Sequence, residues 1–106
     1  MLDKLTKMRV ENMISSSGNS VPNQYEITTR DGTFFQSYKS IICFIDNDGR
    51  IFLDENKWNY SVTTSKYRNK FLNETTRETK KKIKDGTYFL YDPVSYTHLT
   101  LPTNTV

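Results

Sequence analysis

The residues with the clearest chemical potential are the cations between positions 57 and 84. This stretch holds nine Lys or Arg residues against two Glu, a net charge of +7, whereas the whole chain carries +3. Cations neutralise phosphates and aromatic faces can stack on bases, and Trp58, Tyr60 and Tyr67 lie among these cations. We therefore predict nucleic-acid binding through Lys66, Arg68, Lys70, Arg77, Lys80, Lys81, Lys82 and Lys84.

The same cations also fit a solvated helix face. Glu74, Glu78 and Lys82 are spaced for ordinary i, i+4 contacts, and lysines near Lys84 suit the negative end of a helix dipole. The alternative is therefore a structural or protein–protein interaction domain whose lysines serve solubility. Lysines that converge on one surface would favour nucleic acid, and lysines spread around both helices would favour the alternative.

Other chemistry has weaker signals. Cys43 lies in the apolar run 41–45, so we expect a buried thiol, and no glycine-rich phosphate loop is present. The pattern of Asp46, Asp48 and Glu55 resembles a calcium-binding EF-hand loop, but Phe44 occupies the first ligand position. We interpret it as a hairpin turn. We expect no enzyme activity, no metal and no cofactor, because no nucleophile and base can be paired.

Alternating apolar residues predict the strands that would carry these groups. We expect strands at 4–14, 24–30, 33–45 and 51–53, and a last strand at 87–91, with a loop at 15–23. The third strand is long, so a bend is expected near residues 37–40. Asp31-Gly32 predicts a two-residue hairpin turn with positive φ at both positions, and residues 46–49 predict a second turn.

Two helices should hold the basic stretch. Tyr60, Thr64, Tyr67 and Phe71 follow the spacing of an amphipathic helix that starts among residues 61–64 and faces the sheet. A capping box from residue 75 to residue 78 opens a second helix, which a glycine at 86 closes. The predicted fold class is α+β: an antiparallel sheet of about five strands, in the order β-β-β-β-α-α-β, with a helical pair packed on one side.

The sequence also bears on the cellular location of the protein. The first ten residues are interrupted by charges, so they do not form a signal peptide, and the longest apolar run, 41–45, is far too short to span a membrane. The single cysteine allows no intramolecular disulfide, which fits a reducing compartment. We expect a cytoplasmic location in a host cell and no membrane partner.

Several blocks of the sequence carry a resemblance. They are NYSVTTSKYRNKFL at 59–72, ETTRETKKKI at 74–83, ITTRDGTFFQ at 27–36 and SYKSII at 37–42. Over about residues 10–92 they resemble a small uncharacterised family of domains from bacteriophages and prophages. The resemblance implies no activity and no functional residue. The expected partner is nucleic acid, on the ground of the basic stretch, or alternatively a phage or host protein.

The C-terminal segment has a resemblance of another kind. Residues 94–103 read VSYTHLTLPT, which resembles the translation of a transposon-type sequencing adapter. We therefore expect one domain over residues 1–92, C-terminally truncated after Asp92, and an artefactual, unstructured tail at 93–106. The tail should add no strand, with Leu99 and Leu101 not packed among the phenylalanines. It contains the only histidine, His98.

Overall fold

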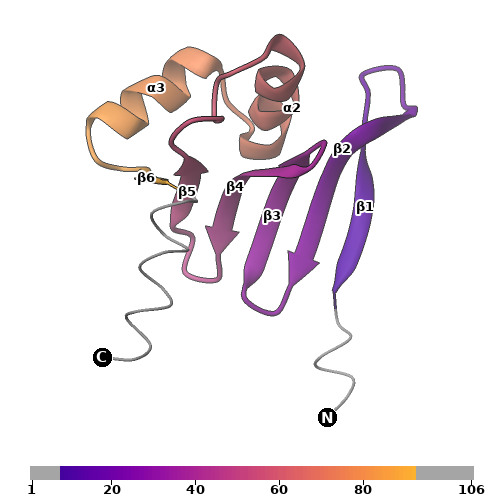
Figure 1. Ribbon diagram of the computed structural model, residues 1–106, viewed down its shortest axis with the longest axis horizontal. Coiled ribbons are helices and arrows are strands. Elements are labelled where there is room, and N and C mark those ends of the chain that lie inside the picture. Colours follow the sequence, from indigo (N-terminus) through magenta and orange to yellow (C-terminus); the bar gives the residue numbers. More distant parts are fainter. Residues whose placement is uncertain (1–7, 93–106) are drawn as a thin grey trace.

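Six strands follow one another across a single sheet in a computed structural model that describes residues 8–92 (Figure 1). Neighbouring strands are antiparallel except β5 and β6, which are parallel because both helices intervene between them. The predicted α+β class is confirmed, with one strand more than expected. The strands are β1 (Arg9–Ile14), β2 (Ser20–Thr29), β3 (Gly32–Ser37), β4 (Ser40–Asp46), β5 (Ile51–Asp54) and β6 (Phe89–Tyr91).

The extra strand arises where a bend was expected. The predicted strand 33–45 is two strands, because the chain reverses at Tyr38 and Lys39 and pairs Ser37 with Ser40. Tyr38 has φ 57°, a left-handed conformation that non-glycine residues seldom adopt. The predicted loop 15–23 is also too long, since β2 already begins at Ser20.

The β2–β3 turn is the expected hairpin, shifted by one residue. Its loop is Arg30 and Asp31, and Gly32 already pairs with Thr29. Of the two positions expected to have positive φ, only Gly32 has it, at 147°. A Cβ at Gly32 would lie 2.2 Å from the Ile45 carbonyl oxygen, so the close approach of β4 requires glycine here.

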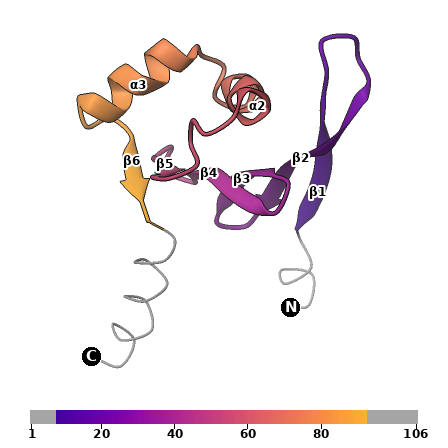
Figure 2. The same cartoon turned by 45° about the horizontal axis from the view of Figure 1, so that its top comes forward.

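Both helices begin as the sequence predicts. Helix α2 (Val62–Leu72) has Ser61 as its N-cap, within the expected range. Helix α3 (Thr76–Lys84) opens with the predicted capping box, in which Thr75 and Glu78 bond each other's backbone amides. The two helices lie over the same face of the sheet (Figure 2).

The buried stripe of α2 differs from the expected one. Thr64 and Tyr67 are buried, and Phe71 is half-buried with its ring centroid 5.8 Å from that of Phe35. Tyr60 lies before the helix and is half-exposed, so it is not part of the stripe. The buried face is extended by Arg68, which lies about 40° beyond Thr64 on the helix surface.

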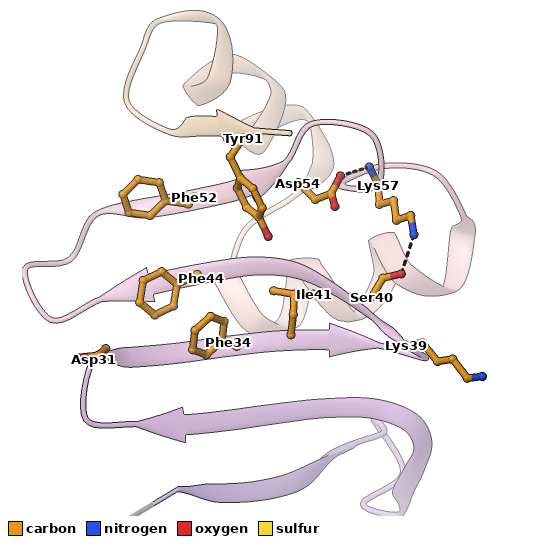
Figure 3. Close-up of a pocket in the computed structure, with 10 residues that line it drawn as sticks. All are labelled: Asp31, Phe34, Lys39, Ser40, Ile41, Phe44, Phe52, Asp54, Lys57 and Tyr91. Carbon is orange, nitrogen blue, oxygen red and sulfur yellow. Dashed lines mark hydrogen bonds between the residues drawn. The ribbon is translucent and has the colours of Figure 1, made fainter. Parts of the chain in front are cut away.

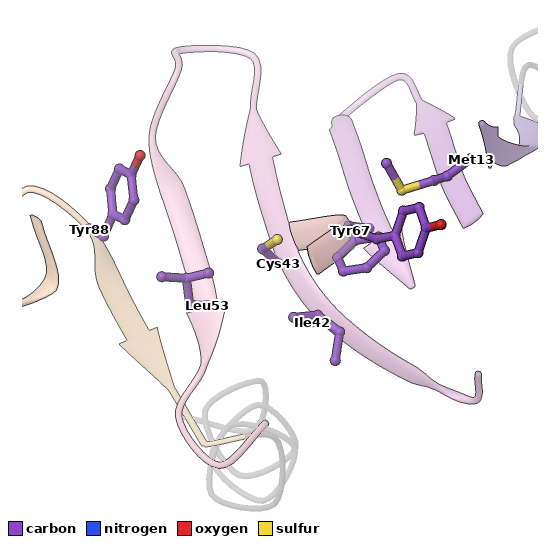
Figure 4. Close-up of a cluster of buried hydrophobic side chains, with 7 residues drawn as sticks. Met13, Ile42, Cys43, Leu53, Tyr67 and Tyr88 are labelled. Atoms are coloured by element: carbon purple, nitrogen blue, oxygen red, sulfur yellow. The ribbon is translucent and has the colours of Figure 1, made fainter. Parts of the chain in front are cut away.

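The sheet has two different faces. Away from the helices, rings from three neighbouring strands form a row: Phe34, Phe44 and Phe52 (Figure 3). Against the helices lies the buried core, in which side chains of β1, β3, β4 and β5 meet residues of α2 and the segment after α3 (Figure 4). The core consists of Met13, Phe35, Ile42, Cys43, Leu53, Tyr67 and Tyr88.

Some expectations concern segments that the structure does not describe. The start of the first strand before residue 8 and the segment 93–106, expected to be an artefactual tail, both lie outside the described residues. Neither α2 nor α3, the helices within residues 8–92, has the length and apolar character needed to cross a bilayer.

Candidate nucleic-acid interface

Helix α3 presents a solvent face made almost entirely of cations. Thr79 is buried and Ile83 half-buried, which fixes the orientation of the helix. Helix α3 carries five cations. At about 100° per residue, all of them except Lys82 fall within an arc of about 100°, away from Thr79 and Ile83. All four are exposed: Arg77, Lys80, Lys81 and Lys84.

These four cations form no direct ion pairs with a carboxylate within 4.0 Å across the described residues, 8–92. Glu78 lies on the same helix, but its carboxylate accepts a hydrogen bond from the backbone of Thr75 at 2.8 Å. Hydrogen bonds from Thr87, helped by nearby Lys81 and Lys82, hold the pKa of Asp85 below its usual value. The face is therefore a concentrated positive surface.

Helix α2 adds a second, smaller pair. Lys66 and Lys70 are exposed on the side of α2 opposite its buried stripe. The Lys70 ammonium donates to the Ile14 carbonyl at 2.7 Å, and the Lys66 ammonium lies 5.4 Å from the Tyr67 ring centroid. A bond from one lysine to the β1–β2 hairpin leaves its charge unneutralised, so both remain candidates for phosphate contact.

Lys82 has a different role. Its ammonium lies 2.8 Å from the Glu74 carboxylate, which also accepts hydrogen bonds from Thr79 at 2.5 Å and from the Tyr88 hydroxyl at 2.6 Å. Burial and the bond to Glu74 raise the pKa of Tyr88 to about 12. Lys82 therefore ties α3 to Glu74 in the connection before it, whose carboxylate also binds Tyr88 after α3, and does not belong to the open basic face.

Arg68 is a correction to the predicted site. Its side chain has no exposed surface, so it cannot reach a phosphate at the surface. The guanidinium donates to the Trp58 carbonyl and, at 2.8 Å each, to the side chains of Asn69 and Thr76. It also lies over the Trp58 ring, 5.1 Å from the centroid. Arg68 joins the segment before α2 to the start of α3.

Most of the aromatic side chains that lie among these cations in the sequence are also unavailable for stacking on bases. Tyr67 is in the core and Trp58 is half-buried under Arg68, so only Tyr60 remains open to solvent. The basic face thus has cations without a row of stacking rings. Of the eight predicted cations, six lie exposed on the outer sides of the two helices, Arg68 is buried, and Lys82 is paired with Glu74.

A family of unknown function, DUF8033, has a family model that matches residues 8–86. The chain belongs to this family. The matched residues include every element from β1 to α3, and therefore the whole basic face of the DUF8033 domain. Comparisons with curated proteins and with solved structures gave no match.

The weaker chemical signals of the DUF8033 domain have structural explanations. Cys43 is fully buried, and burial raises the pKa of its thiol, as expected of a core cysteine. Asp46 accepts backbone bonds from Asp48 and Arg50 in the β4–β5 turn and pairs with the Arg50 side chain at 2.7 Å. Within residues 8–92 no cluster of three metal-ligating side chains occurs.

The Glu74 network predicts a pH dependence of stability. Burial alone would raise the pKa of Glu74, but the bonds from Lys82, Thr79 and Tyr88 outweigh it, so the pKa lies below its usual value. The bonds to the carboxylate therefore stabilise the fold above pH about 4.5 and lose their effect as the pH falls through the lowered pKa. Glu74→Gln should cost about 2 kcal/mol at pH 7.

Urea unfolding at pH 7 and at pH 3 would measure this effect. The difference between wild type and Glu74→Gln should shrink at pH 3, because the carboxylate of the unfolded chain is protonated there and the stabilisation from the lowered pKa declines. Exposed Glu55 offers the control, because Glu55→Gln should change stability little at either pH. A Glu74→Gln penalty that is equal at both pH values would show that the charge of Glu74 is irrelevant.

Proposed function

We propose that the DUF8033 domain is a binding module that contacts nucleic acid electrostatically through the outer face of α3. The observation that carries the proposal is the single arc of exposed, unpaired cations at Arg77, Lys80, Lys81 and Lys84. Such a surface neutralises several adjacent phosphates and releases their counterions. Lys66 and Lys70 extend the positive surface onto α2.

The expected binding is weakly selective for sequence. Lysine predominates among the exposed helix cations and acts on phosphate as a point charge. Phosphate contacts carry no base information, and the face has no Asn or Gln to read base edges. The proposal needs no catalytic step and no cofactor. A phage or prophage protein acting in the host cytoplasm is the setting that we propose for it.

A salt titration tests the proposal. Binding of the chain to an unrelated duplex and to a single strand is measured from about 50 mM salt upward, where phosphate contacts are strongest. The slope of log Kobs against log salt should be near −0.9 for each phosphate contacted on the duplex. Changing Arg77, Lys80, Lys81 and Lys84 together to Gln should remove most of that slope and weaken binding to all sequences alike.

A matched control separates a local surface from total charge. Changing Arg9, Arg30, Lys39 and Lys57 to Gln also lowers the net charge from +3 to −1, but at positions outside the two helices. This variant should keep most of the salt slope. No wild-type binding at about 50 mM salt, or equal losses in both variants, would contradict a binding face on α3.

The interaction-domain alternative is favoured by a different observation. The sheet face away from the helices is apolar, and no described element covers it. Apolar patches of this kind mark protein contacts more often than nucleic-acid contacts. This surface lies on the opposite side of the sheet from α3, so the two binding roles are compatible.

A further inference from the structure

One apolar residue from every strand lies in a single row across the open sheet face. Directly paired residues continue from each strand to the next, so the row crosses the full width of the sheet. The row is Val10, Ile27, Phe34, Phe44, Phe52 and Phe89. Such a row is what buried strands show on an inner face of a two-layer sheet packing.

The row remains partly open to solvent in the single chain. Val10 is 56% exposed and Phe89 is 45% exposed, and the three central phenylalanines are half-buried. Contiguous apolar patches of a few hundred Å² on a monomer often mark interaction sites. The open face therefore has the character of an interface.

The ring geometry and charges argue against a nucleic acid on this face. The Phe34 and Phe44 centroids are 4.3 Å apart and their planes differ by 24°, so these two rings stack on each other. The groove beside the rings, about 730 Å³ in volume, is lined by two lysines and two aspartates. A groove with balanced charges does not attract a phosphate backbone.

The charges at the two ends of the groove differ in sign. Asp31 lies at the turn before β3, next to the ring row, and Lys39 lies at the turn after β3 (Figure 3). Lys57 is on the same side as Lys39 and donates to Ser40 at 2.8 Å. Asp54 is buried and accepts hydrogen bonds from the backbone amides of Asn56 and Lys57. Of the two aspartates that line the groove, only Asp31 is therefore exposed to solvent.

We propose that the open sheet face binds a second copy of this chain, face to face, about a two-fold axis that runs across the strands. This axis reverses the strand direction of the partner. The end with Asp31 then meets the end with Lys39 in both halves of the interface, as an isologous contact requires. The ring row of each copy then lies over the part of the groove that Ile41 lines in the other.

The proposed dimer is modest in size. Six strands about 4.8 Å apart and five residues long cover roughly 400–500 Å² in plan, and side-chain relief brings the accessible area toward the ~800 Å² per partner of a standard interface. We therefore expect a dimer that forms with rising concentration. The inference stands independently of nucleic-acid binding by α3.

Light scattering after size exclusion tests the proposal. The mass of the chain should rise from 12.5 kDa toward twice that value as its concentration increases to about 100 µM. Phe44→Lys, at the centre of the row, should leave the protein monomeric at every concentration. Val62→Lys on α2 is the matched control, because Val62 is 87% exposed on the helical side and should keep the dimer.

Charge reversal tests the orientation and does not depend on the core. At about 50 mM salt, Asp31→Lys and Lys39→Asp should each weaken dimerisation about threefold or more, because each places like charges together twice. The double reversal should restore dimerisation. A wild type that stays monomeric would overturn the proposal, and so would single and double reversals of equal effect. Circular dichroism confirms that each variant is folded.

Discussion

Replacing Arg68 with Ala should lower the free energy of unfolding by about 3–5 kcal/mol, a large fraction of the stability of a small domain. The side chain is fully buried, so its loss leaves a cavity beneath the Trp58 ring. It also leaves the Trp58 carbonyl and the side chains of Asn69 and Thr76 without their donor. The segment before α2 would lose its connection to the start of α3.

Two further variants separate the causes. Arg68→Lys keeps the charge but cannot reach all three acceptors at once, so most of the loss should remain. Arg68→Met restores volume and removes the buried charge, so it should recover part of the stability. Chemical unfolding gives the three free energies. A fully stable Arg68→Ala would show that the guanidinium is not the link between the two helices.

Arg68 also shows why the sequence overestimated the basic site. A charged residue is almost never fully buried without a partner, so composition places it at the surface. Yet Arg68 is four residues after Thr64 and one after Tyr67, which puts it on the buried face of α2. Its partners are carbonyl and side-chain oxygens from three separate segments, and no local pattern brings these together.

The features predicted correctly are local. A capping box and an N-cap depend on residues within four positions, so Thr75, Glu78 and Ser61 carry their own signal. The turn at Tyr38 carries none, because neither Tyr38 nor Lys39 is a typical turn residue. That turn divides the predicted strand at 33–45 into β3 and β4, which is why one strand fewer was predicted than the sheet contains.

The open face was missed for a related reason. Adjacent Phe34 and Phe35 point to opposite faces of β3, so this strand has an apolar ring on each face. Two helices cover only one of them. Sequence periodicity identifies that both faces are apolar, but only the arrangement of α2 and α3 shows which face remains open.

The sidedness of β3 leads to the second large effect. Phe35→Ala should cost about 3–5 kcal/mol, because the Phe35 ring is fully buried and lies against Phe71 of α2. Phe34→Ala, one residue earlier, removes the same atoms from the open face. Phe34→Ala should cost about 1 kcal/mol, because the protein loses the stacking of Phe34 on Phe44 and part of the apolar burial of the ring.

The pair of variants is its own control, since the chemical change, the strand and the charge are identical. Unfolding free energies at low protein concentration measure monomer stability, and light scattering at high concentration measures association. Phe35→Ala should reduce the stability of the monomer, and Phe34→Ala should mainly reduce association. If both variants cost the same stability at low concentration, the open face is covered within the monomer, because an equal loss requires equal burial of the two rings.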